Sequence, residues 1–148
     1  MSKQNYMKYL NTLVQLACWS SLTLQYIAAP VFAKGSSMTP TLPNASIVVV
    51  NRLGNCTLGD VVACKSPLEP GKFVCKRIVG IEGDEVLLDP RVQSNPENLR
   101  FVVPRNHVYL LGDNLMTSHD SRYYGPIPTQ NIVGKVSLML YPSIQWVH

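Results

Sequence analysis

Charge is scarce in this chain of 148 residues. Charged residues make up only 15% of it, the net charge is +4, and no run of Lys and Arg is longer than two. Scattered basic residues do not form the stripe that a nucleic-acid-binding domain presents, so no nucleic-acid partner is expected. Because apolar residues make up 46% of the chain, a disordered protein is excluded as well. The length suits one domain with one core.

Paired cysteines are also absent. The four cysteines, Cys18, Cys56, Cys64 and Cys75, form no CxxC motif. Zinc sites of the finger type need such pairs, so neither a metal nor another cofactor is expected. Cys64 and Cys75 fall in neighbouring predicted strands and could face each other, but free buried thiols are the favoured interpretation.

Residues 9–33 contain no charged side chain, and Lys8 and Lys34 flank them. As a helix this stretch would extend about 37 Å, which is enough to cross a hydrocarbon core of about 30 Å. Polar residues dilute the stretch and could face a partner helix. A signal peptide cleaved after Ala33 and a buried core helix are alternatives, but cleavage would leave Ser37 almost at the new N-terminus. We therefore expect a terminal segment 1–8 and a retained transmembrane anchor over 9–33, with Pro30 ending or kinking the helix.

The chain from residue 35 to residue 148 has a different pattern. Short runs rich in β-branched residues predict strands at 46–50, 60–64, 73–81, 85–88, 100–103, 107–111 and 132–140. Turn signals separate the runs, among them Asp89-Pro90 and Asn95-Pro96. Several short strands at this spacing indicate a mainly β, antiparallel domain, either closed or sandwiched.

A serine segment follows directly on the uncharged stretch, with Gly35, Ser36 and Ser37 in succession. A serine beside a glycine can offer both its hydroxyl and its backbone N–H to a substrate carbonyl. Taken alone, the segment is better explained as a simple linker, because serine-rich turns at a helix end are common.

A lysine lies within the predicted strand 73–81. Val74, Lys76 and Ile78 share one face of that strand. If this face points inward, desolvation lowers the pKa of Lys76 and keeps the amine neutral, so that it can take a proton from a serine hydroxyl. Because both faces of the strand are apolar, periodicity leaves a solvent-facing Lys76 equally open.

A dense polar loop spans residues 112–125. Within it Asp120 and Arg122 are close enough to pair, and Ser118 can form hydrogen bonds. Solvated loops often have this composition. His119 is an alternative general base, which would form a triad with Ser37 and Asp113 or Asp120.

Together these three segments resemble the sequence boxes of type I signal peptidases. Residues 37–42 are similar to Ser-Met-x-Pro-Thr-Leu, residues 76–84 to Lys-Arg-Val-x-Gly-x-x-Gly-Asp, and residues 112–125 to Gly-Asp-Asn followed by Ser-x-Asp-Ser-Arg-x-x-Gly. The resemblance implies a signal-peptidase-like catalytic domain over residues 35–148, behind one N-terminal transmembrane helix. It also implies roles for individual residues: Ser37 as nucleophile, Lys76 as general base, Ser118 as the residue that positions the lysine, and Asp113, Asp120 and Arg122 as supporting residues. The family places no catalytic histidine at position 119, which disfavours the triad.

Within the family, residues 65–67, 75–77 and 121–128 are similar to the mitochondrial inner membrane protease branch, and to its subunit 1 type in particular. This implies a single-pass protein of the mitochondrial inner membrane whose catalytic domain faces the intermembrane space. Such a protease removes sorting signals from preproteins beside a related subunit 2. A bacterial-type signal peptidase and a non-catalytic subunit are the alternatives. Gly35 stands where many bacterial members have a serine that helps to hold the oxyanion, so the Ser37 N–H is left as the local donor.

Overall fold

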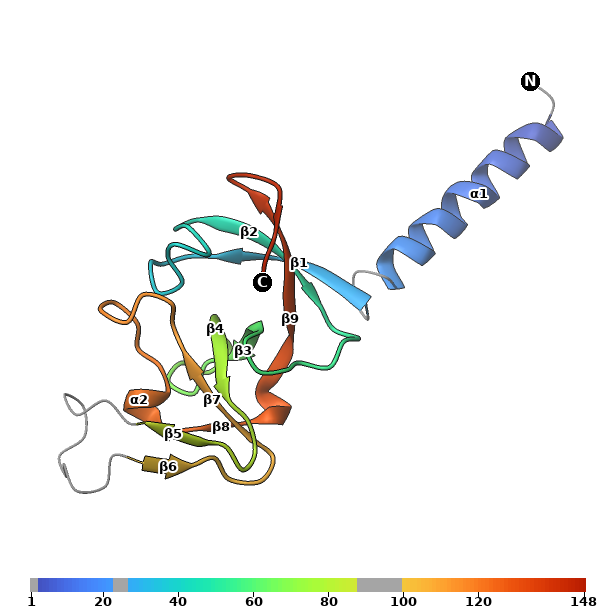
Figure 1. The fold of residues 1–148 in the computed structure, drawn as a ribbon. Coiled ribbons are helices and arrows are strands. Elements are labelled where there is room, and N and C mark those ends of the chain that lie inside the picture. Colours follow the sequence, from blue (N-terminus) through green and yellow to red (C-terminus); the bar gives the residue numbers. More distant parts are fainter. Residues whose placement is uncertain (1–2, 23–26, 88–99) are drawn as a thin grey trace.

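The computed structural model describes residues 3–22, 27–87 and 100–148, and consists of a mainly antiparallel β domain with one N-terminal helix (Figure 1). The helices are α1 (Lys3–Leu22) and the short α2 (Ser121–Tyr124), and a 3-10 turn covers Thr129–Asn131. The strands are β1 (Ala28–Ala33), β2 (Ser46–Asn51), β3 (Val61–Lys65), β4 (Phe73–Gly80), β5 (Glu85–Leu87), β6 (Arg100–Val102), β7 (His107–Leu111), β8 (Ile127–Pro128), β9 (Ile132–Tyr141) and β10 (Gln145–Trp146). The predicted fold class is confirmed.

Each of the seven predicted runs contains a strand of the structure, namely β2 to β7 and β9. Leu88, the last residue of one predicted run, lies outside the described residues, as do the turn signals at 89–90 and 95–96. The sequence did not predict β1, β8 and β10, of which β8 and β10 have only two residues each.

The helix predicted over residues 9–33 is wrong at its C-terminal end. Helix α1 ends at Leu22 and residues 28–33 form β1, while residues 23–26 lie outside the described part of the chain. Pro30 does not end a helix. It lies in an edge strand, where a missing backbone N–H is tolerated. Over the described ranges, no helix is both long enough and apolar enough to cross a membrane.

The large sheet has the order β1-β2-β9-β3-β4-β7-β8, with β10 added to β9, and β5 and β6 pair separately. The pairs from β1 through to β4 are all antiparallel. Four such steps separate β1 from β4, so these two strands run in the same direction. Register shifts between β2 and β9 and between β3 and β9 add local bending. The sheet therefore curls into a half-barrel (Figure 1).

Two apolar clusters fill the two faces of the curled sheet. One contains Val48, Val50, Val136 and Met139, and the other contains Val62, Ile78 and Leu110. Cys64 pairs with Val74, and Cys75 pairs with Ala63. Cys64 and Cys75 therefore point to opposite faces and do not face each other, and all four cysteines are free thiols.

Candidate active site

The serine segment is fixed in place by its own apolar residues. It leaves the end of β1 through Gly35, whose φ of 111° favours glycine. Met38 and Leu42 are 3% and 2% exposed and pack in the core. The Leu42 N–H donates to the Met38 carbonyl at 2.8 Å. Ser37 is thus held half-buried between the end of a strand and a buried turn.

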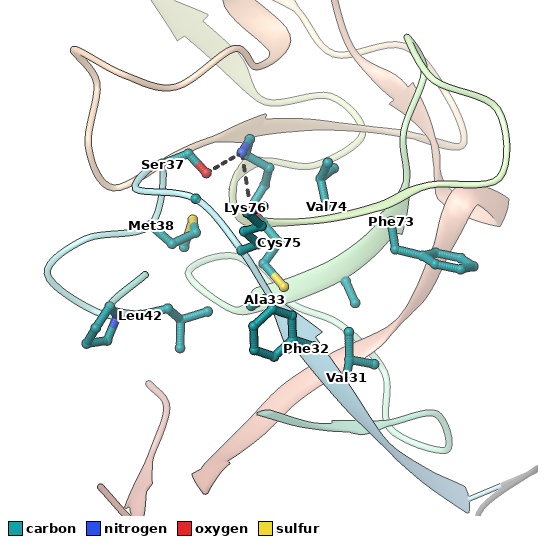
Figure 2. A pocket seen from close by; sticks show the side chains of 14 residues that line it. Val31, Phe32, Ala33, Ser37, Met38, Leu42, Phe73, Val74, Cys75 and Lys76 are labelled. Carbon is teal, nitrogen blue, oxygen red and sulfur yellow. Dashed lines mark hydrogen bonds between the residues drawn. The ribbon is translucent and has the colours of Figure 1, made fainter. Parts of the chain in front are cut away.

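The structure brings Ser37 and Lys76 into direct contact. The Nζ atom of Lys76 lies 2.9 Å from the Oγ atom of Ser37 and 3.2 Å from the carbonyl oxygen of Cys75 (Figure 2). Lys76 is only 3% exposed. The alternation on β4 left both faces open, and the structure places Lys76 on the inward one.

Burial dominates the electrostatics of Lys76. Desolvation holds the pKa of its amine below the ordinary 10.5, and the negative charge of Asp120 and, more weakly, that of Asp113 oppose this effect. No carboxylate among the described residues forms a salt bridge with Lys76. Burial therefore favours the neutral form of this amine, which lies beside the Ser37 hydroxyl.

Asp113 is held by Arg77, a residue to which the sequence analysis assigned no role. The guanidinium donates from Nε to Oδ1 at 2.8 Å and from Nη2 to Oδ2 at 2.7 Å, which is the bidentate geometry that arginine favours. The Thr41 hydroxyl donates to the same carboxylate at 2.5 Å, and Arg77 also reaches the Gly59 carbonyl at 2.7 Å. Asp113 and Arg77 thus tie the serine segment to β4 and to the polar loop. The sequence signal that could have found the Arg77–Asp113 ion pair is the need of the Asp113 carboxylate for a positively charged partner.

Asp120 and Arg122 form the predicted pair deep in the loop. Their Nε to Oδ1 distance is 2.8 Å, and the side chains are 6% exposed for Arg122 and 0% for Asp120. Asp120 also accepts from the Gly112 amide at 3.0 Å and caps α2. Burial would raise the pKa of this carboxyl, but its hydrogen bonds from Arg122 and Gly112 outweigh burial and lower it. The pair therefore stays ionised and braces the loop.

The loop docks on the backbone of Ser37. The Asn114 N–H donates to the Ser37 carbonyl at 3.0 Å. Gly112 permits this close approach, because a Cβ atom there would lie 2.2 Å from the Ser118 Oγ and 2.5 Å from the Ser37 carbonyl oxygen. Ser118 is 4% exposed, and its hydroxyl lies near the Asp120 carboxyl, whose pKa it helps to lower, but it makes no well-aligned hydrogen bond within the described part of the chain. A buried hydroxyl beside the Ser37 backbone is thus available to the site.

His119 lies apart from this arrangement. Its side chain is exposed and stacks on Tyr123, with ring centroids 4.3 Å apart. The contact of the Ser37 hydroxyl is with Lys76 instead. Over the described ranges no three His, Cys, Asp or Glu side chains are placed to hold a metal ion.

A small cavity of about 80 Å³ opens beside the Ser37 and Lys76 side chains (Figure 2). Its walls come from β1, β3, β4 and the serine segment, and include Val31, Ala33, Met38, Leu42, Ala63 and Cys75. Both strands that flank it have an unpaired edge: β1 pairs only with β2, and β4 pairs with β7 only from Arg77 onward, within the described residues. The cavity therefore lies at an open seam of the half-barrel. Burial raises the pKa of the Cys75 thiol to about 11, so this wall is neutral.

Comparison with known proteins identifies the family. The model of the family "Signal peptidase, peptidase S26" matches residues 6–94 and 87–141. A Mus musculus protein named mitochondrial inner membrane protease subunit 1 is 38% identical over 136 residues, which cover 87% of this chain and 79% of that protein. The Schizosaccharomyces pombe protein of the same name is 35% identical, over 90% of this chain and 87% of that protein.

Subunit 2 of the mitochondrial inner membrane protease of Saccharomyces cerevisiae is 31% identical, over 76% of this chain and 68% of that protein. A crystal structure of a signal peptidase I from Enterococcus faecalis covers 57% of this chain and 98% of that chain, with 23% identity and a TM-score of 0.44. The family match extends over most of the chain, and the mouse and fission yeast relatives are aligned over more than three quarters of their lengths. The chain therefore belongs to the signal peptidase family, peptidase S26.

Proposed function

We propose that this protein is a serine endopeptidase in which Ser37 is the nucleophile and Lys76 is the general base. The observation that carries the proposal is the 2.9 Å contact between Lys76 Nζ and Ser37 Oγ, made by a lysine that is 3% exposed. Because burial lowers its pKa, the amine can be neutral before the reaction starts.

In the reaction, the Lys76 amine takes the proton of the Ser37 hydroxyl while Oγ attacks the carbonyl carbon of the scissile bond. The oxyanion that forms is stabilised by the backbone N–H of Ser37. The Lys76 ammonium then gives its proton to the leaving amine, and an acyl-enzyme on Ser37 remains. In the second half, neutral Lys76 takes a proton from a water molecule that attacks the ester. The proton returns to Ser37 Oγ as the carboxylic acid product leaves.

The supporting residues hold this geometry. Ser118 offers a buried hydroxyl that can accept a hydrogen bond from the lysine amine and so aim it. Asp113 and the Asp120–Arg122 pair fix the loop that touches the Ser37 backbone. We assign them a positioning role, because their hydrogen bonds run to each other and to the backbone.

The substrate is a preprotein segment bound in extended form. The unpaired edges of β1 and β4 run parallel on the two sides of the cavity, so a peptide between them can pair with both and close the seam. The cavity of about 80 Å³ favours a small side chain next to the cleaved bond. The relatives named mitochondrial inner membrane protease support sorting signals of intermembrane-space proteins as the substrates.

We further propose a single-pass protein of the mitochondrial inner membrane with residues 35–148 in the intermembrane space. Lys3 and Lys8 are the only charged residues before Lys34, and positive charge tends to stay on the side from which insertion occurs. Helix α1 has 20 residues, and its uncharged part, residues 9–22, extends about 21 Å. Gln4, Asn11 and Gln15 recur on one side of this helix at helical spacing, and such polar side chains can pair with a neighbouring helix.

The neighbouring helix would come from a related second subunit, since the similarity extends to a protein named subunit 2. Two polar helices that cover each other's polar sides could enter a bilayer more easily than either helix alone.

The test is cleavage of a radiolabelled intermembrane-space precursor by the full-length protein in detergent. We expect cleavage after a small residue by the wild-type protein and none by Ser37→Ala. A wild-type protein that leaves the precursor intact, alone and together with a related second subunit, would overturn the proposed activity. Protease added to mitochondria with ruptured outer membranes should digest residues 35–148. Survival of these residues until the inner membrane is lysed would show the opposite orientation.

A further inference from the structure

The Ser36 carbonyl, one residue before the proposed nucleophile, is the end point of a short chain of hydrogen bonds. It accepts two bonds from Thr39, one from the backbone N–H at 3.2 Å and one from the hydroxyl at 2.8 Å. The Asn114 side chain in turn donates from Nδ2 to the Thr39 hydroxyl oxygen at 3.0 Å. The polar loop 112–125 is thus connected through Thr39 to the Ser36 carbonyl.

This carbonyl belongs to the same peptide group as the Ser37 N–H. In a planar trans peptide the C=O and the N–H point in opposite directions, so hydrogen bonds that fix the carbonyl also fix the direction of the N–H. A carbonyl that accepts hydrogen bonds also polarises its peptide group, which makes the N–H a stronger donor. Within residues 3–22, 27–87 and 100–148 the Ser37 N–H donates to no acceptor, so it is available to a ligand.

The same N–H is the oxyanion donor of the proposed reaction, and Gly35 has no side-chain hydroxyl to share this task. A donor stabilises developing charge best when its direction is fixed before the reaction. From this geometry we infer that Thr39 is a positioning residue of the oxyanion site, whose hydroxyl orients and polarises the Ser36–Ser37 peptide group. The inference rests on the proposed function. Position 39 is the one that the Ser-Met-x-Pro-Thr-Leu box leaves open, so the resemblance assigns it no role.

A purely structural role for Thr39 makes a different prediction. The two bonds from Thr39 also close a turn over residues 36–39, and Ser and Thr hydroxyls stabilise turns in this way. Thr129 offers a matched comparison outside the site, because its N–H and its hydroxyl both donate to the Asn106 carbonyl, at 2.9 and 3.2 Å. If such a pair of bonds only stabilises a turn, loss of either threonine hydroxyl should leave kcat of the folded protein unchanged.

The experiment measures kcat and KM of the full-length protein in detergent on a soluble peptide substrate, at a temperature where circular dichroism shows every variant to be folded. Thr39→Val removes the hydroxyl and keeps the shape, and we expect kcat to fall about tenfold while KM changes by less than about twofold. This loss is smaller than the roughly 100-fold cost of removing an oxyanion donor, since the Ser37 N–H itself remains. Thr39→Ser keeps the hydroxyl and should hold kcat within about twofold of the wild-type value.

Two further variants sharpen the test. Thr39→Ala also lacks the hydroxyl, so it should lose as much activity as Thr39→Val. Thr129→Val is the matched control and should keep kcat. In all four variants the pH dependence of kcat/KM should keep its midpoint, because the hydrogen bonds of Lys76 go to Ser37 and to the Cys75 carbonyl.

An unchanged kcat in Thr39→Val, or a loss that Thr39→Ser shares, would overturn the inference. A shifted pH midpoint would overturn it as well, since Thr39 would then act through the contact between Lys76 and Ser37. Failure of the wild-type protein to cleave the peptide, or full activity in Ser37→Ala, would count against the proposed function instead, so the two failures can be told apart.

Discussion

Two neighbouring basic residues, Lys76 and Arg77, lie on opposite faces of β4 and have different surroundings. Lys76 is 3% exposed and, among the described residues, donates hydrogen bonds only to a hydroxyl and a carbonyl, whereas Arg77, one residue later, forms a bidentate pair with Asp113. The pKa of Lys76 is lowered because burial removes water from the amine. The hydrogen bonds of Arg77 to Asp113 are the largest contribution to its raised pKa. Lys76 thus has the surroundings that the proposed base needs, whereas Arg77 holds the loop in place through its ion pair. The two residues differ because a carboxylate lies against Arg77 and none forms an ion pair with Lys76 among the described residues.

The largest effect is expected when Lys76 or its partner Ser37 is replaced. We expect Lys76→Met and Ser37→Ala each to lower kcat by about 10⁴-fold or more, because the two groups act as one unit. The double variant should then be little worse than either single one. Precursor cleavage under single-turnover conditions is the measurement. Substantial activity in Lys76→Met, together with its loss in His119→Ala, would favour the histidine triad instead.

A second large effect on the rate is expected at the contact between the loop 112–125 and the backbone of Ser37. In Gly112→Ala the new Cβ atom would lie 2.5 Å from the Ser37 carbonyl oxygen and 2.2 Å from the Ser118 Oγ. One of these groups must move, and a displacement of about 1 Å at a reacting centre can cost about 100-fold in rate. The far-ultraviolet circular dichroism and kcat should be measured together.

Gly54→Ala is the control for that substitution, because the nearest atom to its Cβ would be 3.7 Å away. It should keep both the fold and the activity. Equal activity of the two variants would remove the loop contact from the reaction.

The pH dependence of cleavage tests whether the pKa of Lys76 is lowered. The active form of Lys76 is the neutral amine, so kcat/KM should fall about tenfold for each pH unit below its pKa and level off above it. Because that pKa is lowered by burial, the plateau should begin at a lower pH than it would for a lysine with the ordinary pKa of 10.5. A profile that still rises steeply near pH 10 would contradict a desolvated Lys76.

The same pKa shift affects stability. Between the lowered folded-state pKa and the ordinary unfolded-state value, the unfolded chain binds the extra proton, so the contribution of Lys76 to stability increases with pH in that window. Lys76→Met removes this contribution. Its free energy of unfolding should accordingly depend less on pH there than that of the wild-type protein.

The smallest expected effect is a change in stability when the Arg77–Asp113 ion pair, the clamp, is weakened. Arg77→Lys keeps the charge but cannot reproduce the bidentate contact with Asp113, so we expect a loss of about 1–2 kcal/mol in the free energy of unfolding. Arg105→Lys is the control, because Arg105 pairs with Glu82 while its side chain is 89% exposed. An exposed pair of this kind should change stability by less than about 0.5 kcal/mol. Urea denaturation of both variants gives the measurement, and equal losses would argue that the clamp is no stronger than a surface pair.

The local sequence pattern predicted most of the strands, but it missed β1 and the two-residue strands. Strand β7 begins and ends at the predicted residues, and β4 differs from its predicted run by one residue. Strand β1 was assigned to a helix, because Ala28, Ala29 and Pro30 form part of a long uncharged run and carry no alternation of polar and apolar residues. It becomes a strand by pairing with β2 along all six of its residues. A two-residue strand such as β8 gives too short a pattern for any prediction.

The sequence by itself determined the chemical inventory of the site. The Ser37, Lys76 and Gly112–Gly125 segments could be named in advance because together they resemble the sequence boxes of one family, although each segment alone also fitted a purely structural role. Their mutual placement came from the fold, which brings Ser37 and Lys76 together although 39 residues separate them.

Only the tertiary structure decided which face of β4 is inward, and therefore that Lys76, the proposed base, is buried beside Ser37. Both faces of the strand are apolar in sequence, so alternation alone could not choose between them. The choice depends on Ser37, whose hydroxyl meets Lys76, and on Asp113, which approaches Arg77 from a different loop. Burial and the position of a carboxylate are properties of the assembled sheet, and these two properties shift the balance between the charged and the neutral form of a lysine.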